Sequence, residues 1–197
     1  MTVTRRAATL PVSFFDRPAD AVARELLGAL VVSRADGALT SARIVETEAY
    51  LGPEDAASHA AFRPGSHALI YGEGGYAYVY LNYGIHYCLN AVAGAAGRPG
   101  CVLIRALEPA AGLSTMARRR GIPSDSTRLA SGPGNLTRAL GIDLRENGAD
   151  LTRGLFTIEP PDSPRDFRIA AGPRIGITRA TDLRLRFWIA DNPFVSR

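Results

Sequence analysis

Hydrophobic positions near the start of the chain follow the spacing of an amphipathic helix. They come directly after Asp16-Arg17-Pro18, a combination typical of a helix start, and are Ala21, Val22, Leu26, Leu27 and Leu30. We therefore expect a capped helix whose apolar face packs on the core.

The pattern then changes to the two-residue period of a β-strand. A short apolar run at residues 31–33 and a turn at Asp36-Gly37 precede a predicted strand over residues 42–50. Alternate residues of a strand share one face, and on this strand they are Ile44, Glu46, Glu48 and Tyr50. The strand is thus expected to place two carboxylates beside a tyrosine.

Downstream, short strands outnumber helices. We expect a loop over residues 52–75, a hairpin of residues 76–82 and 86–92, and a strand over 101–107. Helices are expected at 113–120 and 136–140, and short strands at 156–159, 174–178 and 185–189. No repeat or linker divides the 197 residues, which predicts a single α+β domain with a curved antiparallel sheet, flanking helices and a protruding hairpin. Residues 1–14 are expected to form a flexible N-terminal segment.

Composition is compatible with a nucleic-acid partner but does not by itself favour one. The chain carries 23 basic and 19 acidic residues, a net charge of +4, and every basic residue is an arginine. Arginine binds phosphate through two parallel hydrogen bonds and stacks on bases, so the bias suits nucleic acid. A GC-rich bacterial genome, which favours arginine codons, would produce the same bias, and both interpretations remain open.

The few cysteines and histidines indicate no metal site. Cys88 and Cys101 are too few and too far apart for zinc, and both fall in strand-like apolar runs. His59, His67 and His86 have no second ligand at helical spacing. No apolar segment has the length of a membrane span. We expect a cytoplasmic, nucleoid-associated bacterial protein with reduced thiols and no cofactor.

Tyrosine is concentrated in one part of the chain, since all seven lie between Tyr50 and Tyr87. Alternate tyrosines in the predicted hairpin would line one face of any half-buried strand. Tyr83 and Ile85, however, fall at the hairpin tip, where large apolar groups are costly to expose unless they meet a partner. Such a tip is suited to wedge into a DNA minor groove and replace an extruded base.

The two carboxylates of the 42–50 strand allow two interpretations. Glu46 and Glu48 could face solvent on an ordinary half-exposed strand. Alternatively, one of them is a catalytic base at the floor of an aromatic pocket. A carboxylate there can deprotonate water and stabilise a developing cation, the two requirements for breaking a glycosidic bond through an oxocarbenium-like state.

Several ordered blocks of the chain resemble the alkyladenine (3-methyladenine) DNA glycosylases of the mammalian-type family. Residues 43–55 are R-I-V-E-T-E-A-Y-L-G-P-E-D, followed by Ser58-His59, and residues 78–90 are Y-V-Y-L-N-Y-G-I-H-Y-C-L-N. Further blocks are C-V-L-I-R-A-L-E-P at 101–109, S-G-P-G-N-L-T-R-A-L-G-I at 131–142, R-I-G-I at 174–177 and N-P-F-V-S at 192–196. The resemblance runs from about residue 15 to the C-terminus.

The resemblance implies a monomeric enzyme that acts on double-stranded DNA without a cofactor. Its expected substrates are alkylated or deaminated purines, namely 3-methyladenine, 7-methylguanine, hypoxanthine and ethenoadenine, which are flipped out of the duplex before the N-glycosidic bond is hydrolysed. Carried over by position, Glu48 matches the general base for the attacking water. Arg105 and the backbone carbonyl of Ile175 match groups that hold that water.

The same resemblance assigns the base pocket. Tyr50, His59 and Tyr80 match the walls that enclose the flipped base, and the His59 backbone also reads its edge. Asn90 matches the residue that crowds the exocyclic amine of normal guanine, and Leu103 is also expected in the pocket.

The resemblance also assigns the DNA contacts. Tyr83 matches the residue inserted into the vacated stack, and Ile85 stands where the family usually has methionine. The chain departs from the family in the loop at residues 63–71 and at Asn135, which replaces a usual lysine, so a phosphate contact is assigned to Arg138 instead.

The residues favour hydrolysis over a lyase reaction. A lyase forms a Schiff base through an amine, and the chain contains no lysine. Two other classes remain possible. A non-enzymatic nucleic-acid-binding module would not need Glu48, and a nucleoside hydrolase would not need the wedge of Tyr83 and Ile85.

Overall fold

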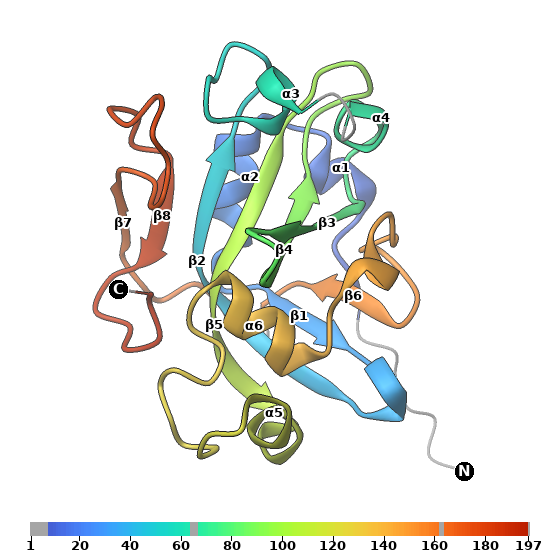
Figure 1. Cartoon of the computed structure of the whole chain (residues 1–197), viewed down its shortest axis with the longest axis vertical. Coiled ribbons are helices and arrows are strands. Elements are labelled where there is room, and N and C mark those ends of the chain that lie inside the picture. The colour runs from blue at the N-terminus through green and yellow to red at the C-terminus, as the bar shows by residue number, and fades with distance from the viewer. Residues whose placement is uncertain (1–7, 64–66, 162–163, 197) are drawn as a thin grey trace.

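The computed structural model describes residues 8–63, 67–161 and 164–196. Its described part is organised by a curled antiparallel sheet, flanked by short helices (Figure 1). The strands are β1 (Leu30–Ser33), β2 (Thr40–Tyr50), β3 (Ala77–Asn82), β4 (His86–Val92), β5 (Cys101–Ala111), β6 (Phe156–Glu159), β7 (Ile169–Gly172) and β8 (Arg186–Ile189). They pair in the order β3-β4-β5-β2-β1-β6, and β8 pairs with both β2 and β7. The expected α+β class with a curved sheet is confirmed.

The helices are short. They are α1 (Val12–Phe15), α2 (Ala19–Leu26), α3 (His59–Phe62), α4 (His67–Ile70), α5 (Leu113–Arg120) and α6 (Pro133–Leu140), with 3₁₀ turns at Ala35–Gly37 and Leu144–Glu146. The predicted amphipathic helix is α2, whose buried face includes Val22 and Leu26. The expected cap is wrong, because the residue at the N-cap position is Pro18, whose side chain cannot accept a hydrogen bond from the helix. Leu30 already belongs to β1, since the helix ends at Leu26.

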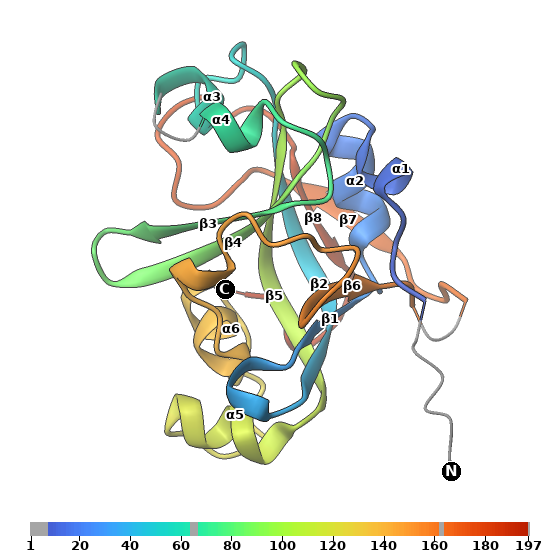
Figure 2. The ribbon, with the colours of Figure 1, turned by 90° about the vertical axis from the view of Figure 1, so that its right-hand side faces the viewer.

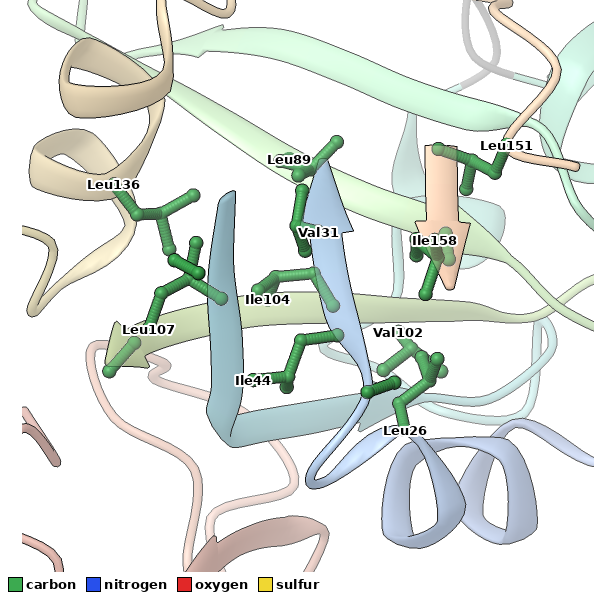
Figure 3. Packing of buried hydrophobic residues seen from close by; sticks show 14 of the residues in the cluster. Leu26, Val31, Ile44, Leu89, Val102, Ile104, Leu107, Leu136, Leu151 and Ile158 are labelled. Carbon is green, nitrogen blue, oxygen red and sulfur yellow. The ribbon is translucent and has the colours of Figure 1, made fainter. Parts of the chain in front are cut away.

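Apolar side chains from the strands and from helices α1, α2, α5 and α6 form the main core (Figure 3). It joins Leu26 of α2 and Leu136 of α6 to Ile44, Ile104 and Leu107 of the long strands, all with no solvent exposure. Burying a side chain of this size contributes roughly 1.5–3 kcal/mol relative to leaving it in water. The long strands β2 and β5 are therefore fixed firmly along most of their length.

Two expected elements are different in the structure. The predicted loop at residues 52–75 contains α3 and α4, so it is more ordered than its glycine and proline content indicates. The strand expected at 174–178 is absent, and the neighbouring strand is β7, which ends at Gly172. Pro173 has no N–H to donate to a ladder, and Gly176 has a φ of 75°, so both residues interrupt strand pairing. This segment is attached to the rest of the fold by the side chain of Arg174 and not by strand pairing.

The N-terminal segment is described in part. Residues 1–7 lie outside the described residues, whereas Leu10 is buried and its N–H donates to the carbonyl of Ile158. Within the described ranges, no helix combines the length and apolar character needed to cross a bilayer.

An irregular stretch of β2 decides which side chains reach the site. Opposite β5, the register shifts between Ile44 and Glu46 and again between Glu46 and Thr47. Ile44 and Val45 consequently both join the core. The core-facing residues of β2 have even numbers before the bulge and odd numbers after it. The expectation that Ile44 shares a face with Glu46, Glu48 and Tyr50 is thus wrong, because a bulge separates it from them.

The β3–β4 hairpin projects from the body of the domain, on the side of the sheet opposite α2 (Figure 2). At its tip Tyr83 and Gly84 have φ values of 51° and 69°, and Ile85 N–H donates to Asn82. Positive φ at both positions is the geometry of a tight hairpin turn of the primed class, and glycine adopts it without steric cost. The first turn of α6 packs against the hairpin at Gly134, where any Cβ would lie 2.7 Å from the His86 ring.

Candidate active site

A cavity of about 840 Å³ lies along β3 and the adjoining ends of β4 and β5. Its wall includes eight of the residues expected at the site, namely Tyr50, His59, Tyr80, Tyr83, Asn90, Leu103, Arg105 and Ile175. The hairpin contributes Tyr83 to the mouth, and α6 contributes Pro133. The structure therefore brings residues from five separate parts of the chain around one space large enough for a flipped nucleotide.

Glu48 lies directly behind this wall, with no solvent exposure. Its Oε1 accepts the N–H of Ile175 at 2.7 Å, and its Oε2 accepts the hydroxyl of Tyr50 at 2.9 Å. The guanidinium of Arg105 adds an ionic contact, with Nη1 3.3 Å from Oε1. All three of these neighbours line the cavity.

The electrostatic environment makes Glu48 a stronger base than an exposed glutamate. Burial raises the pKa of its carboxyl above the ordinary value of 4.5, because the charged form loses its hydration. Arg105, the Ile175 N–H and the Tyr50 hydroxyl oppose that rise, and Glu46 adds to it. A carboxylate with a raised pKa binds a proton more readily, which suits a group that must take one from water.

Glu46 is also buried, but it has a different set of partners. Its Oε1 accepts Arg186 Nε at 2.6 Å, and its Oε2 accepts the Ser196 N–H at 2.8 Å. Arg105 Nε lies 3.3 Å from the same Oε1, without the alignment of a hydrogen bond. Arg105 therefore lies between two buried carboxylates, one on each side of its guanidinium. The alternative that Glu46 and Glu48 face solvent is wrong, since neither has any exposed surface.

Aromatic rings form one side of the cavity. The rings of His59 and Tyr80 are 4.6 Å apart at 59°, and His59 Nδ1 is 2.8 Å from the Tyr78 hydroxyl. Burial, assisted by Arg63, lowers the pKa of His59 to about 4, so the imidazole is neutral near pH 7. Burial likewise raises the pKa of Tyr80 well above its ordinary value. The His59 and Tyr80 rings of the wall are thus uncharged near pH 7, and Arg63 and Arg105 line the same cavity.

Tyr50 connects this aromatic wall to the carboxylate. Its hydroxyl donates to Glu48, and its ring lies under the guanidinium of Arg174, 4.7 Å from the ring centroid. Burial and the adjacent Glu48 charge raise the pKa of Tyr50 far above its ordinary value, so the phenol keeps its proton and remains a donor.

Asn90 and Leu103 lie side by side on β4 and β5, where they form a register pair. The amide of Asn90 donates to the Tyr78 carbonyl at 3.0 Å, which fixes the side chain in the cavity wall. Leu103 in turn pairs with Glu48 across β5 and β2. A base bound between the aromatic rings would therefore have Asn90 and Leu103 near its edge.

The residues assigned to DNA contacts lie outside this enclosed region. The side chains of Tyr83 and Ile85 are 82% and 72% exposed at the hairpin tip, although both are large and mainly apolar. Arg138 is exposed on α6, and its Nε donates to the carbonyl of Arg119. Tyr83 and Ile85 are thus presented to solvent at the hairpin tip, where Tyr83 also lines the cavity mouth, and Arg138 is presented on the exposed side of α6.

Two features of the site were missed by sequence reasoning. Arg174 and Asp55 form a fully buried ion pair beside Tyr50, and Glu46 is held by Arg186 and Ser196. Each joins parts of the chain more than a hundred residues apart, so no local spacing identifies it. The sequence offered only a weaker signal, namely acidic residues within or directly after an apolar strand. If such residues are buried, they require a buried cation as partner.

The thiols of the site are unreactive. Cys88 and Cys101 are free and buried, as expected, and both line the cavity. Burial raises the pKa of Cys101 to about 12 and also raises that of Cys88, so neither supplies a thiolate near pH 7. Among the described residues, no cluster of three histidine, cysteine or acidic side chains is arranged to hold a metal ion.

Comparison with known proteins identifies relatives along nearly the whole chain. The family model described as methylpurine-DNA glycosylase matches residues 13–193. A protein of Methanoculleus marisnigri, provisionally named a 3-methyladenine DNA glycosylase, is 44% identical over 192 residues, which cover 96% of this chain and 99% of the relative. A protein of Koribacter versatilis with the same provisional name is 45% identical over 193 residues, covering 96% and 93%.

Proposed function

Because the chain belongs to the methylpurine-DNA glycosylase family, we propose that it flips damaged purines out of duplex DNA into the cavity described above and removes them there. Membership in this family makes the chain an N-glycosyl hydrolase that acts in DNA repair. The proposal adds the manner of base removal, the substrates and the residues that act.

The observation that carries the proposal is the position of Glu48. Its carboxylate is buried behind a cavity lined by aromatic rings, with Arg105 beside it and the Ile175 N–H on one oxygen. A carboxylate has about four lone-pair positions, so the bonds from Ile175 and Tyr50 leave acceptor capacity for a water molecule. Arg105, together with the backbone carbonyl of Ile175, would orient that water.

In the proposed reaction Glu48 takes a proton from the water while the water oxygen bonds to the C1′ carbon of the sugar. The C1′–N bond breaks, and its electron pair leaves with the purine. The negative charge of Glu48 also stabilises the cation that develops on the sugar. The products are a free base and an intact abasic site.

Substrate selection follows from the character of the leaving group. The cavity wall is aromatic, and its imidazole is neutral because burial lowers the His59 pKa to about 4. Stacking in such a wall favours a flat, electron-poor base. Methylation at N3 or N7 gives the purine a positive charge, which weakens the glycosidic bond and improves the leaving group. We therefore expect 3-methyladenine and 7-methylguanine as substrates, with hypoxanthine and ethenoadenine as neutral ones.

The hairpin tip supports action on a duplex. Tyr83 is large enough to replace one flipped nucleotide, and it is presented to solvent at 82% exposure with Ile85 beside it. A hydrolase of free nucleosides has no use for such a wedge. We further propose that the enzyme acts as a monomer, because one chain supplies the carboxylate, the pocket and the wedge.

The test is base release from a duplex oligonucleotide that carries a single 7-methylguanine, measured under single-turnover conditions. Glu48→Gln is expected to abolish release and to leave affinity for the lesion duplex within about tenfold, because the amide keeps the shape and loses the basicity. Glu108→Gln removes a carboxylate from the partly exposed ion pair with Arg43 on the same two strands, and it is the matched control. Wild-type rates in Glu48→Gln would assign the base to another residue.

A further inference from the structure

Arg105 is the shared partner of two buried carboxylates, neither of which lines the cavity itself. Its Nη1 is 3.3 Å from Glu48 Oε1, and its Nε is 3.3 Å from Glu46 Oε1. The hydrogen-bond partners of Glu48, Tyr50 and Ile175, line the cavity, whereas those of Glu46, Arg186 and Ser196, do not. Glu46 therefore adjoins the cavity only through Arg105. Its burial therefore needs an explanation other than direct contact with substrate.

The partners of Glu46 come from the C-terminal part of the chain. Arg186 on β8 donates its Nε to Oε1 at 2.6 Å, and the N–H of Ser196 donates to Oε2 at 2.8 Å. Arg186 is itself held, because its Nη2 donates to the Ser196 carbonyl at 3.2 Å and its guanidinium lies 4.6 Å from the centre of the Trp188 ring. Two hydrogen bonds thus hold Glu46 independently of Arg105, which makes it rigid enough to position Arg105.

The charges of this group are balanced. Two carboxylates, Glu46 and Glu48, face two guanidiniums, Arg105 and Arg186. Without the charge of Glu46, both guanidiniums would share one carboxylate, and Arg105 would be free to form a closer pair with Glu48. A closer cation would stabilise the ionised form of Glu48, lower its pKa and make it a weaker base.

We propose that Glu46 is a positioning residue, which holds Arg105 between the two carboxylates so that the guanidinium orients water without neutralising Glu48. Arg186 and the backbone N–H of Ser196 hold Glu46 in turn, so the C-terminal segment takes part in the catalytic centre. The inference rests on the proposed role of Glu48 as the general base.

The proposal predicts a change in pH dependence and not only in rate. The base must be ionised, so excision declines as pH falls through the pKa of Glu48. The charged and titratable groups around Glu48 are Glu46 and Tyr50 on β2, Arg105 on β5, Cys88 on β4, Arg186 opposite Glu48 on β8, and Arg174 in the segment after β7. Of these groups, Glu46 is the other carboxylate, and its negative charge raises the pKa of Glu48. Loss of that charge lowers the pKa, so the acidic limb of the rate profile moves to lower pH.

The experiment compares Glu46→Gln with the unaltered enzyme on duplex DNA containing 7-methylguanine, whose fixed charge removes the need for a general acid. Single-turnover rates are measured across about pH 4–9. We expect the maximal rate to fall by about 10- to 100-fold, the usual cost of removing a partner that orients an active group. The midpoint of the acidic limb is expected to move to lower pH.

Two further variants keep the test decisive where Glu46→Gln folds poorly. Ser196→Pro removes the N–H that holds Glu46 and should lower the rate in the same direction. Ser196→Ala keeps that N–H and removes only the hydroxyl, which accepts a hydrogen bond from Arg105 Nη2 at 3.5 Å, so the rate loss should be larger in Ser196→Pro than in Ser196→Ala; equal losses would show that the N–H to Glu46 is not needed and would overturn the inference. Melting temperatures identify any variant that has lost its fold.

The controls separate this inference from the role of Glu48. If Glu48→Gln remains active, the proposed base is wrong. If Glu48→Gln is inactive while Glu46→Gln keeps the acidic limb of the unaltered enzyme, Glu46 has a structural role alone and the inference is overturned. A rate loss in Glu108→Gln equal to that in Glu46→Gln would also overturn it, because Glu108 pairs with Arg43 and makes no contact with Arg105.

Discussion

Arg174 and Asp55 form a bidentate ion pair that has no solvent contact, although 119 positions separate them in the chain. Arg174 also donates to the Ala49 carbonyl at 3.0 Å and covers the ring of Tyr50. The next residue, Ile175, donates its N–H to Glu48. The pair therefore fastens the segment that carries Ile175 to the end of β2, where Glu48 and Tyr50 lie.

We predict that Asp55→Asn lowers the free energy of unfolding by about 3–5 kcal/mol, because it leaves a buried guanidinium without its counter-charge. For a chain of this size the melting temperature should fall by roughly 10 °C or more. Although burial itself favours the neutral acid, Arg174 and two backbone N–H groups hold the pKa of Asp55 below its ordinary 3.8. Its contribution is thus present at neutral pH and is lost only as pH falls through that lowered value.

Calorimetry or thermal unfolding monitored by circular dichroism measures this effect. The double variant Asp55→Asn/Arg174→Met removes both charges and should recover part of the loss. A double variant no more stable than Asp55→Asn would show that the unpaired charge is not the cause.

A second prediction concerns the pH dependence of the unaltered enzyme. Burial, opposed by Arg105, raises the pKa of Glu48 above 4.5, so the rate on 7-methylguanine DNA should decline as pH falls through a midpoint above that value. His59 should not contribute, since its pKa is lowered to about 4 and it stays neutral above that pH. Single-turnover rates of the enzyme and of His59→Gln, plotted against pH, should have the same midpoint; a displaced midpoint in His59→Gln would assign the titration to the imidazole.

The sequence predicted the local elements of this site better than its long-range contacts. The hairpin and α5 have recognisable local patterns, and the structure confirms the positions of Tyr83 and Leu113–Arg120. The bulge at Val45 was not predicted, because an apolar residue there fits a regular strand equally well. The carboxylates were recognised as unusual, but whether Glu46 and Glu48 face solvent depends on strands and loops far along the chain.

A third prediction is that the reaction leaves an intact abasic site. The chain contains no lysine to form a Schiff base, and the cavity thiols remain protonated because burial raises their pKa values. Borohydride added during turnover should trap no covalent complex, and the DNA strand should remain uncut until alkali is added. A trapped complex on a denaturing gel would refute hydrolysis by water alone.

A fourth prediction concerns the wedge. Tyr83→Ala should weaken binding to a lesion duplex by roughly 1–3 kcal/mol, the usual contribution of one aromatic side chain that stacks on bases. Binding to undamaged duplex should change less, since no base is flipped there. Fluorescence anisotropy on matched duplexes gives both affinities. Equal losses on the two duplexes would mean that Tyr83, with its φ of 51°, serves only the shape of the turn.

A fifth prediction concerns the rejection of guanine, which differs from hypoxanthine by its exocyclic amine. Asn90 is 4% exposed, and its amide is fixed by the Tyr78 carbonyl, so it cannot move aside for an extra group. Asn90→Ser should raise excision of mispaired guanine while changing excision of hypoxanthine much less. The ratio of single-turnover rates in matched duplexes is the measurement, and a ratio equal to that of the unaltered enzyme would place the filter elsewhere.

The bulge in β2 makes the core and the catalytic centre share the same stretch of backbone. From the bulge onward, Glu46 and Glu48 alternate with residues that face the opposite side of the strand. Val45 and Ala49 pack in the core, and the Thr47 hydroxyl donates to the Ala23 carbonyl. Because interiors are close-packed, a change of side-chain volume on the inner face shifts the backbone that carries the carboxylates. Adaptation of such a strand to heat or cold therefore has to adjust core packing and the position of the two carboxylates together.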